Sequence, residues 1–82
     1  MSQKYQDVQQ FIEDCNLGED IEFAYHGIGY GVFGWYPGGP LAYRKDAFGY
    51  YEQQFDDANA VLDGFQIEGQ PLRNRITEIE ND

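Results

Sequence analysis

The sequence predicts an α+β domain, in which a small antiparallel sheet of three or four strands has an N-terminal helix and two C-terminal helices packed on one face. Two observations support this prediction. Apolar residues recur with helical spacing near both ends of the chain, whereas residues 21–54 alternate and are interrupted by glycine-rich turns. Because the chain has 82 residues and 17% of them are aromatic, we expect one domain over residues 1–82 whose small core depends on large rings.

The first helix is expected before Gly18. Its apolar residues are spaced at i, i+3, i+4 and i+7, which is typical of one helix face: Tyr5, Val8, Phe11, Ile12 and Cys15. We expect Ser2 to cap the N-terminus, Asp7 to lie in the early part of the helix, and Gly18 to end it.

Strands are expected from residue 21 onwards. Ile21, Phe23 and Tyr25 alternate with other residues as in a half-buried strand, and the sequence HGIG at residues 26–29 predicts a turn. A second strand then runs from Tyr30 to Tyr36. In that strand one side would carry Tyr30, Val32 and Tyr36, and the other side Phe33 and Trp35.

A turn and further strands follow. The sequence YPGG at residues 36–39 predicts a type II turn, because proline is favoured at its second position and glycine at its third. Residues 41–44 and 48–53 favour strand structure, either as one bent strand or as two, with residues 45–49 as a turn or bulge between them.

The helical pattern returns near residue 56. We expect Asp56 to cap this helix, Asp57 to lie in its first turn and Gly64 to end or disturb it. Its apolar stripe comprises Ala58, Val61, Leu62 and Phe65. A connector with an inward-pointing Ile67 then leads to Pro71, which opens a last helix whose apolar residues are Leu72, Ile76 and Ile79. Residues 80–82 are expected to be solvated.

The charge and cysteine content exclude several functional classes. Fifteen acidic and five basic residues produce a net charge of −10. Affinity for phosphate comes from Lys and Arg, so direct binding to nucleic acid or to an anionic membrane is not expected. The acidity would suit a basic partner or mimicry of nucleic acid, or it only keeps the protein soluble. A single cysteine and the absence of a signal-peptide or membrane-helix pattern favour a cytoplasmic location.

Three glycines have the spacing of a dinucleotide-binding turn, G-x-G-x-x-G: Gly29, Gly31 and Gly34. That turn needs a helix directly after the third glycine, because the helix N-terminus binds the pyrophosphate. Residues 35–39 read WYPGG and cannot start a helix. We therefore interpret the glycines as turns, bulges or space beside large rings.

Neither catalysis nor metal binding is predicted. His26 stands beside a turn without a nucleophile constellation, and Cys15 lies in an apolar stripe where we expect a buried, unreactive thiol. Asp14, Asn16 and Asp20 lack the glycine and glutamate that a calcium loop needs at its sixth and twelfth positions. We expect no enzyme activity, no cofactor and no metal.

Aromatic residues are dense between residues 25 and 51: Tyr25, Tyr30, Phe33, Trp35, Tyr36, Tyr43, Tyr50 and Tyr51. Alternation would send these rings to both sheet faces, whereas the helices can cover only one. Exposed Trp and Tyr side chains are frequent anchors of protein interfaces. The candidate interaction surface therefore comprises Tyr30, Phe33, Trp35, Tyr36, Tyr50 and Tyr51. The alternative is that all of these rings stabilise strand pairs and the core.

These features favour a non-enzymatic interaction module that binds another protein, or a second copy of itself as a homodimer, through an aromatic sheet face. Two alternatives stay open. The chain would stack a carbohydrate or small planar ligand on Trp35 and Tyr36, or it would act as a nucleic-acid mimic that inhibits a basic partner.

The order of motifs also resembles a known group. The hairpin sequence IEFAYHGIGYGV is followed by a tail of the form L-x-x-F-x-I-x-G-x-x-L, which comprises Leu62, Phe65, Ile67, Gly69 and Leu72. Together they resemble small acidic, uncharacterised proteins of Gram-positive bacteria and their prophages. The resemblance does not extend over residues 34–51, and its motifs are structural. It implies the fold and a bacterial or prophage source, but no activity and no site.

Overall fold

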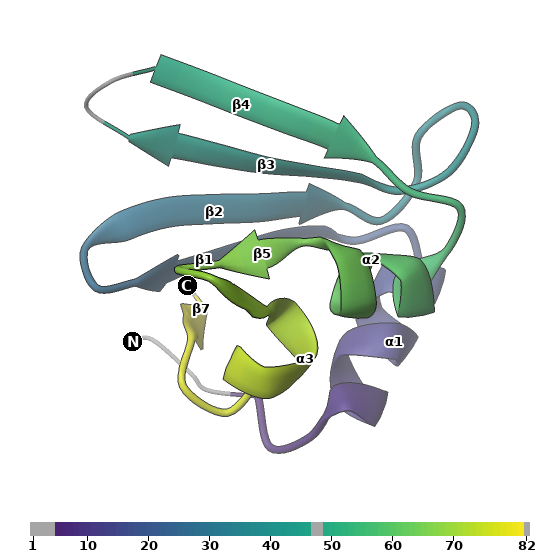
Figure 1. The fold of residues 1–82 in the computed structure, drawn as a ribbon. Coiled ribbons are helices and arrows are strands. Elements are labelled where there is room, and N and C mark those ends of the chain that lie inside the picture. Colours follow the sequence, from purple (N-terminus) through teal and green to yellow (C-terminus); the bar gives the residue numbers. More distant parts are fainter. Residues whose placement is uncertain (1–4, 47–48, 82) are drawn as a thin grey trace.

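The computed structural model describes residues 5–46 and 49–81. Within these residues the chain forms an antiparallel sheet of five strands in the order β4-β3-β2-β1-β7, together with three helices on one side of the sheet and the small hairpin β5–β6 (Figure 1). The elements are α1 (Val8–Asn16), β1 (Asp20–Tyr25), β2 (Ile28–Phe33), β3 (Leu41–Asp46), β4 (Gly49–Gln54), α2 (Ala58–Gly64), β5 (Gln66–Ile67), β6 (Gln70–Pro71), α3 (Leu72–Arg75) and β7 (Glu80–Asn81). The predicted fold class is confirmed.

Helix α1 begins later than the sequence predicts. Asp7 has extended backbone and is the N-cap, because its Oδ1 accepts a hydrogen bond from the Gln10 N–H at 3.0 Å. The predicted cap Ser2 lies outside the described residues. The expected end is confirmed, since Gly18 has a φ of +79° and donates its N–H to the Cys15 carbonyl at 3.0 Å.

The β1–β2 hairpin turns more tightly than predicted. His26 and Gly27 alone form the turn, with φ angles of +51° and +81°, which is type I′ geometry. Strand pairing therefore starts at Tyr25 and Ile28, and β2 ends at Phe33 opposite Asp20. The predicted extension of β2 to Tyr36 is wrong, because β2 ends at Phe33 and one more backbone bond, from the Gly34 N–H to the Glu19 carbonyl at 2.9 Å, closes the pairing with the preceding strand.

The predicted turn at residues 36–39 is confirmed. Gly39 donates its N–H to the Tyr36 carbonyl at 2.9 Å, and Gly38 adopts a φ of +96°, as the third residue of a type II turn must. The chain then forms two strands, β3 and β4, which pair in unbroken antiparallel register from Leu41–Gln54 to Asp46–Gly49. Phe48 and the predicted bulge around it lie partly outside the described residues.

The C-terminal part differs from the prediction in its details. Asp57, not Asp56, caps α2, because the Asp57 Oδ1 accepts a hydrogen bond from the Ala60 N–H at 2.8 Å. The expected connector is the hairpin β5–β6, and Pro71 precedes α3 as its cap residue. Both expected apolar stripes are confirmed as buried, including Ile67 in the hairpin: Ala58, Val61, Leu62, Phe65, Ile67, Leu72, Ile76 and Ile79.

The last strand was missed. Glu80 and Asn81 pair with Ala24 and Phe23 and extend the sheet on the far side of β1, where the sequence predicts no strand. The reason is tertiary, since the burial of Ile79 brings the residues after it alongside β1.

The core lies between the helices and one face of the sheet. Phe23 and Tyr30 stack there with ring centroids 5.5 Å apart, and Phe65 meets Tyr30 edge-on at 6.0 Å. None of the helices in the described part of the chain has the length and apolar character needed to cross a membrane.

Candidate interaction surface

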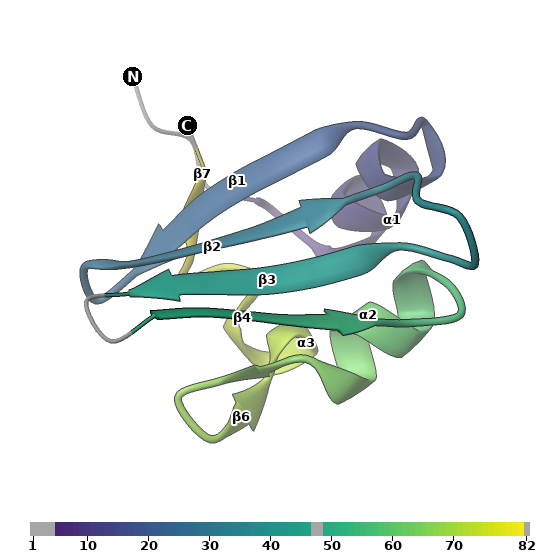
Figure 2. The ribbon, with the colours of Figure 1, turned by 90° about the horizontal axis from the view of Figure 1, so that it is seen from above.

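Strand register divides the sheet into two faces. Ile21, Val32 and Ala42 are paired across β1, β2 and β3 and are buried against the helices. The residues one position away on each strand point to the opposite side. We call that side the open face, and its residues on the four long strands are Asp20, Glu22, Ala24, Gly29, Gly31, Phe33, Leu41, Tyr43, Lys45, Tyr50, Glu52 and Gln54. Figure 2 looks onto these strands, with the helices behind them.

Three aromatic rings cross the open face from strand to strand. The Phe33 ring on β2 lies 5.1 Å from the Tyr43 ring on β3, and the Tyr43 ring stacks on Tyr50 of β4 at 5.7 Å with 20° between the ring planes. Tyr50 is 56% exposed. We call Phe33, Tyr43 and Tyr50 the ring stack. It forms a continuous aromatic surface over three neighbouring strands.

Gly31 makes the position of the Tyr43 ring possible. Gly31 pairs with Tyr43 on the open face, and a Cβ atom at Gly31 would lie only 2.2 Å from the Tyr43 Cζ. Because glycine lacks that atom, the ring lies flat over the backbone of β2. This is one of the roles that we expected for the G-x-G-x-x-G glycines. Gly29 and Gly31 lie in β2, Gly34 directly follows it, and the next element along the chain is strand β3 rather than a helix.

Carboxylates surround the ring stack. Burial raises the pKa of the Tyr43 phenol, and the charges of Glu22 and Asp20 raise it further. Desolvation and the adjacent Glu52 carboxylate raise the pKa of the Tyr50 phenol. Both hydroxyl groups therefore stay protonated to higher pH than a free tyrosine, and they lie in a negative local potential.

A shallow hollow adjoins the ring stack. It has a volume of about 250 Å³ and is lined by Glu22, Phe23, Ala24, Gly29, Tyr30, Tyr43 and Lys45. Ala24 and Gly29 are a pair on the open face and contribute almost no side-chain volume. The hollow thus offers a carboxylate, an ammonium group and a phenol within a small area of sheet.

The six residues of the predicted surface are not all in one place. Phe33 and Tyr50 lie on the open face. Trp35 and Tyr36 lie in the loop after β2 and are 73% and 45% exposed. Tyr51 is 51% exposed, but it points to the helix side of β4, opposite to its neighbour Tyr50.

Tyr30 does not belong to the surface. It is only 3% exposed and packs between Phe23 and Phe65, because it shares the face of β2 with the buried Val32. The prediction missed Tyr43, the central ring of the stack. The available signal was the pair of glycines in β2, which leaves bare sheet that a ring from a neighbouring strand can cover.

The other candidate residues have structural roles. Cys15 is buried as predicted, and burial raises the pKa of its thiol, with a further contribution from Asp57, so the reactive thiolate form is disfavoured. His26 is exposed in its turn as expected, with its Nδ1 2.7 Å from the Glu68 Oε2. Within residues 5–46 and 49–81, no cluster of three His, Cys, Asp or Glu residues has the arrangement of a metal site.

Comparison of the chain with protein-family models, with curated proteins and with solved structures finds no match. The resemblance to small acidic proteins of Gram-positive bacteria and their prophages therefore stays a prediction. Functional inference rests on the geometry of the open face.

Proposed function

We propose that this chain is a non-enzymatic protein-interaction module that binds a basic protein surface on its open face. The observation that supports this proposal is the ring stack, a continuous aromatic surface flanked by carboxylates on the sheet face that the described helices leave uncovered. Aromatic surface in water is unfavourable by about 25 cal/mol per Å² relative to its buried state, so a partner that covers these rings gains affinity from their burial.

The chemistry around the rings suits arginine side chains. A guanidinium group stacks on the face of a tyrosine ring and also forms paired hydrogen bonds with carboxylates. Tyr43 and Tyr50 offer the ring faces, and Asp20, Glu22 and Glu52 offer carboxylates on the same face. The net charge of −10 would accelerate the approach of a basic partner at low salt.

The same charges disfavour a second copy of the chain as the occupant. A symmetric dimer through the open face would bury Asp20, Glu22 and Glu52 of both copies in one interface, with Lys45 as the one basic residue that the four long strands place on that face. Each copy also carries a charge of −10, so association would oppose a long-range repulsion. A basic partner removes both penalties.

Carbohydrate binding is the second candidate, and the hollow beside Tyr43 favours it. A sugar ring would stack on Tyr43 while its hydroxyl groups bond to Glu22 and Lys45 at the rim. Trp35 and Tyr36, which the sequence suggested for stacking, lie in the loop after β2 and do not line this hollow. The nucleic-acid mimic stays a prediction, because it depends on the acidic residues of the whole surface.

Binding of deca-arginine and deca-lysine peptides tests the proposal. We expect deca-arginine to bind about fivefold or more tighter than deca-lysine by isothermal titration calorimetry, because only guanidinium groups stack well on rings. The double variant Tyr43→Ala/Tyr50→Ala should abolish that preference.

The matched control is Tyr51→Ala, which removes an equally exposed tyrosine from the opposite side of β4 and should retain the preference. Equal affinity for the two peptides, or equal losses in the double variant and the control, would contradict the proposal. Amide shifts around Glu22 and Lys45 with a panel of monosaccharides would instead support carbohydrate binding.

A further inference from the structure

Strand β4 forms one edge of the sheet, and some of its backbone N–H and C=O groups point outwards, away from the sheet. Among the described residues, β4 pairs with β3 on one side and with no strand on the other. The Phe55 N–H donates to the Pro40 carbonyl at 2.9 Å, so Phe55 and Pro40 form a hydrogen-bonded pair. Hydrogen-bonded pairs alternate with non-bonded pairs along an antiparallel ladder, so every second pair of β4 and β3, counted back from Phe55, is hydrogen-bonded as well. Gln53 and Tyr51 therefore bond to β3, whereas the N–H and C=O groups of the intervening residues point outwards. These residues are Tyr50, Glu52 and Gln54.

The edge at β4 lacks most of the devices that protect sheet edges, and Glu52 is the one charged residue in it. Natural edge strands are short, or they carry proline, lysine or a bulge. The opposite edge, β7, has only two residues. β4 has six exposed residues with the sequence GYYEQQ, in unbroken register with β3. Such an edge is a template for another strand.

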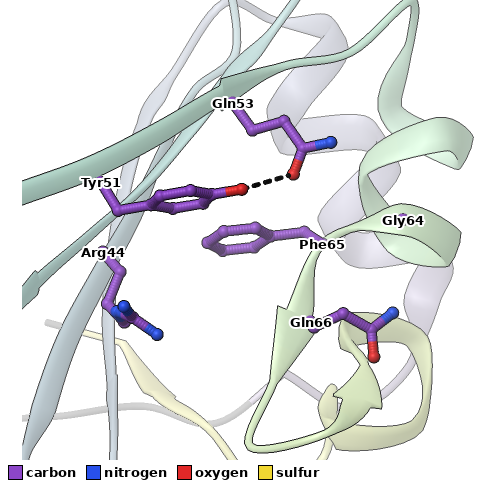
Figure 3. A pocket seen from close by; sticks show the side chains of 6 residues that line it. All are labelled: Arg44, Tyr51, Gln53, Gly64, Phe65 and Gln66. Carbon is purple, nitrogen blue, oxygen red and sulfur yellow. Dashed lines mark hydrogen bonds between the residues drawn. The ribbon is translucent and has the colours of Figure 1, made fainter.

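A groove runs under this edge on the helix side of the sheet. It has a volume of about 220 Å³ and is lined by Arg44, Tyr51, Gln53, Gly64, Phe65 and Gln66. Figure 3 shows Tyr51 and Gln53 of β4 on one side of the groove and Phe65 and Gln66, which follow α2, on the other. The Tyr51 hydroxyl donates to the Gln53 Oε1 at 3.3 Å, and the Arg44 guanidinium lies 5.7 Å from the centre of the Tyr51 ring. Both contacts hold the Tyr51 ring at the mouth of the groove.

We propose that β4 binds an extended segment of a partner protein as an added strand. Apolar and basic side chains alternate along that segment. An added antiparallel strand bonds to the outward groups of Tyr50, Glu52 and Gln54. Its residues opposite Tyr51 and Gln53 point into the groove, where the Phe65 ring and the Tyr51 ring favour an apolar side chain. Its residues opposite Tyr50 and Glu52 lie on the open face, where a ring and a carboxylate favour a basic side chain.

A second copy of the chain does not fit this edge as well. A twofold pairing of β4 with itself that uses all three outward residues is centred on Glu52. The two Glu52 carboxylates would then lie directly opposite each other on one face, and like charges at that position are destabilising. The edge site shares Tyr50 and Glu52 with the surface of the proposed function, but its backbone groups and the groove are separate from that surface. A failure of strand addition and a failure of arginine binding to the ring stack are therefore distinguished by peptides of equal composition.

The probe for this site is a capped eight-residue peptide of alternating leucine and arginine. Its controls are a peptide with four leucines followed by four arginines, and the alternating peptide with N-methyl groups on every second amide. We expect the alternating peptide to bind about tenfold or more tighter than either control. Only this peptide has both unmethylated backbone N–H groups and alternating leucine and arginine side chains. On binding, amide hydrogen exchange at Tyr50, Glu52 and Gln54 should become slow.

Two variants of one residue separate strand addition from charge attraction. Glu52→Pro removes an outward N–H, and proline is tolerated there because that group does not bond to β3. It should lower the affinity for the alternating peptide about tenfold, whereas Glu52→Gln, which retains the N–H, should lower it less than about threefold.

Three results would overturn the inference: equal binding of the N-methylated peptide to the unmodified protein, protection of amides away from β4, or concentration-dependent dimerisation that Glu52→Pro abolishes. The first two need no variant, so they decide the question even if Glu52→Pro does not fold.

Discussion

The two faces of one sheet use the same residue types for different purposes. On the helix side, Tyr30 is stacked on Phe23, meets Phe65 edge-on and is almost inaccessible to water. On the open face, Tyr43 stacks on Tyr50 and tilts against Phe33, with Asp20 and Glu22 in the vicinity. The helix-side tyrosine is part of the core, whereas the open-face tyrosine belongs to a surface that its own chain leaves available. The comparison shows that aromatic content alone does not separate core residues from interface residues.

The largest expected difference between the faces is in stability. Tyr30→Ala should lower the free energy of unfolding by about 3–5 kcal/mol, because it removes a fully packed ring from the core. Tyr43→Ala should lower it by about 1 kcal/mol, since only one side of its ring rests on the sheet. Urea denaturation of the two variants measures the difference. Similar losses in both variants would show that the open face is part of the stabilising core.

A smaller effect is expected at Gly31, where the open face depends on the absence of a side chain. Gly31→Ala should lower the free energy of unfolding by about 1 kcal/mol, because the new Cβ displaces the Tyr43 ring. In a Tyr43→Ala background the same substitution should have almost no effect. A double-mutant cycle in urea measures this coupling, and additive losses would contradict the direct contact between Gly31 and Tyr43.

The smallest expected effect is a loss of stability at alkaline pH. The folded chain raises the pKa of Tyr43 above the ordinary value of about 10, so the folded state holds this proton more tightly than the unfolded state does. The stability that the folded state gains from this proton is fully present below about pH 10 and is lost as the pH rises through the pKa of Tyr43 in the folded state. As the pH rises above about 9, the urea midpoint of the Tyr43→Phe variant should therefore fall less steeply than that of the unmodified protein. An identical fall in both proteins would show that Tyr43 ionises as freely in the fold as in the unfolded chain.

Local pattern sufficed for much of the fold. Helical spacing identified the buried stripe of α2, and strict alternation identified Ile21, Phe23 and Tyr25 as the inward side of β1. The sequence YPGG specified its turn, because proline and glycine have backbone preferences that act within four residues. Capping was predicted less well, since Asp56 and Asp57 are chemically equivalent and only the path of the chain into α2 selects Asp57.

Partners across the sheet could not be derived from local pattern. Tyr30 and Tyr43 both occupy alternating strands, yet one is buried and the other is on the open face. Strand pairing decides that Tyr43 lies over Gly31, and the packing of the helices decides that the face with Tyr30 is covered. Similarly, Glu80 and Asn81 have no strand pattern of their own and become β7 only because β1 is available beside them.

The amino-acid sequence by itself thus determined the helices, the alternation, the acidic charge and the surplus of aromatic rings, because these depend on residues close together in the chain. The tertiary structure alone decided which side of the alternation faces water, where the rings meet and which strand edge stays unpaired. The physical reason is that a strand's two sides are equivalent until long-range packing covers one of them.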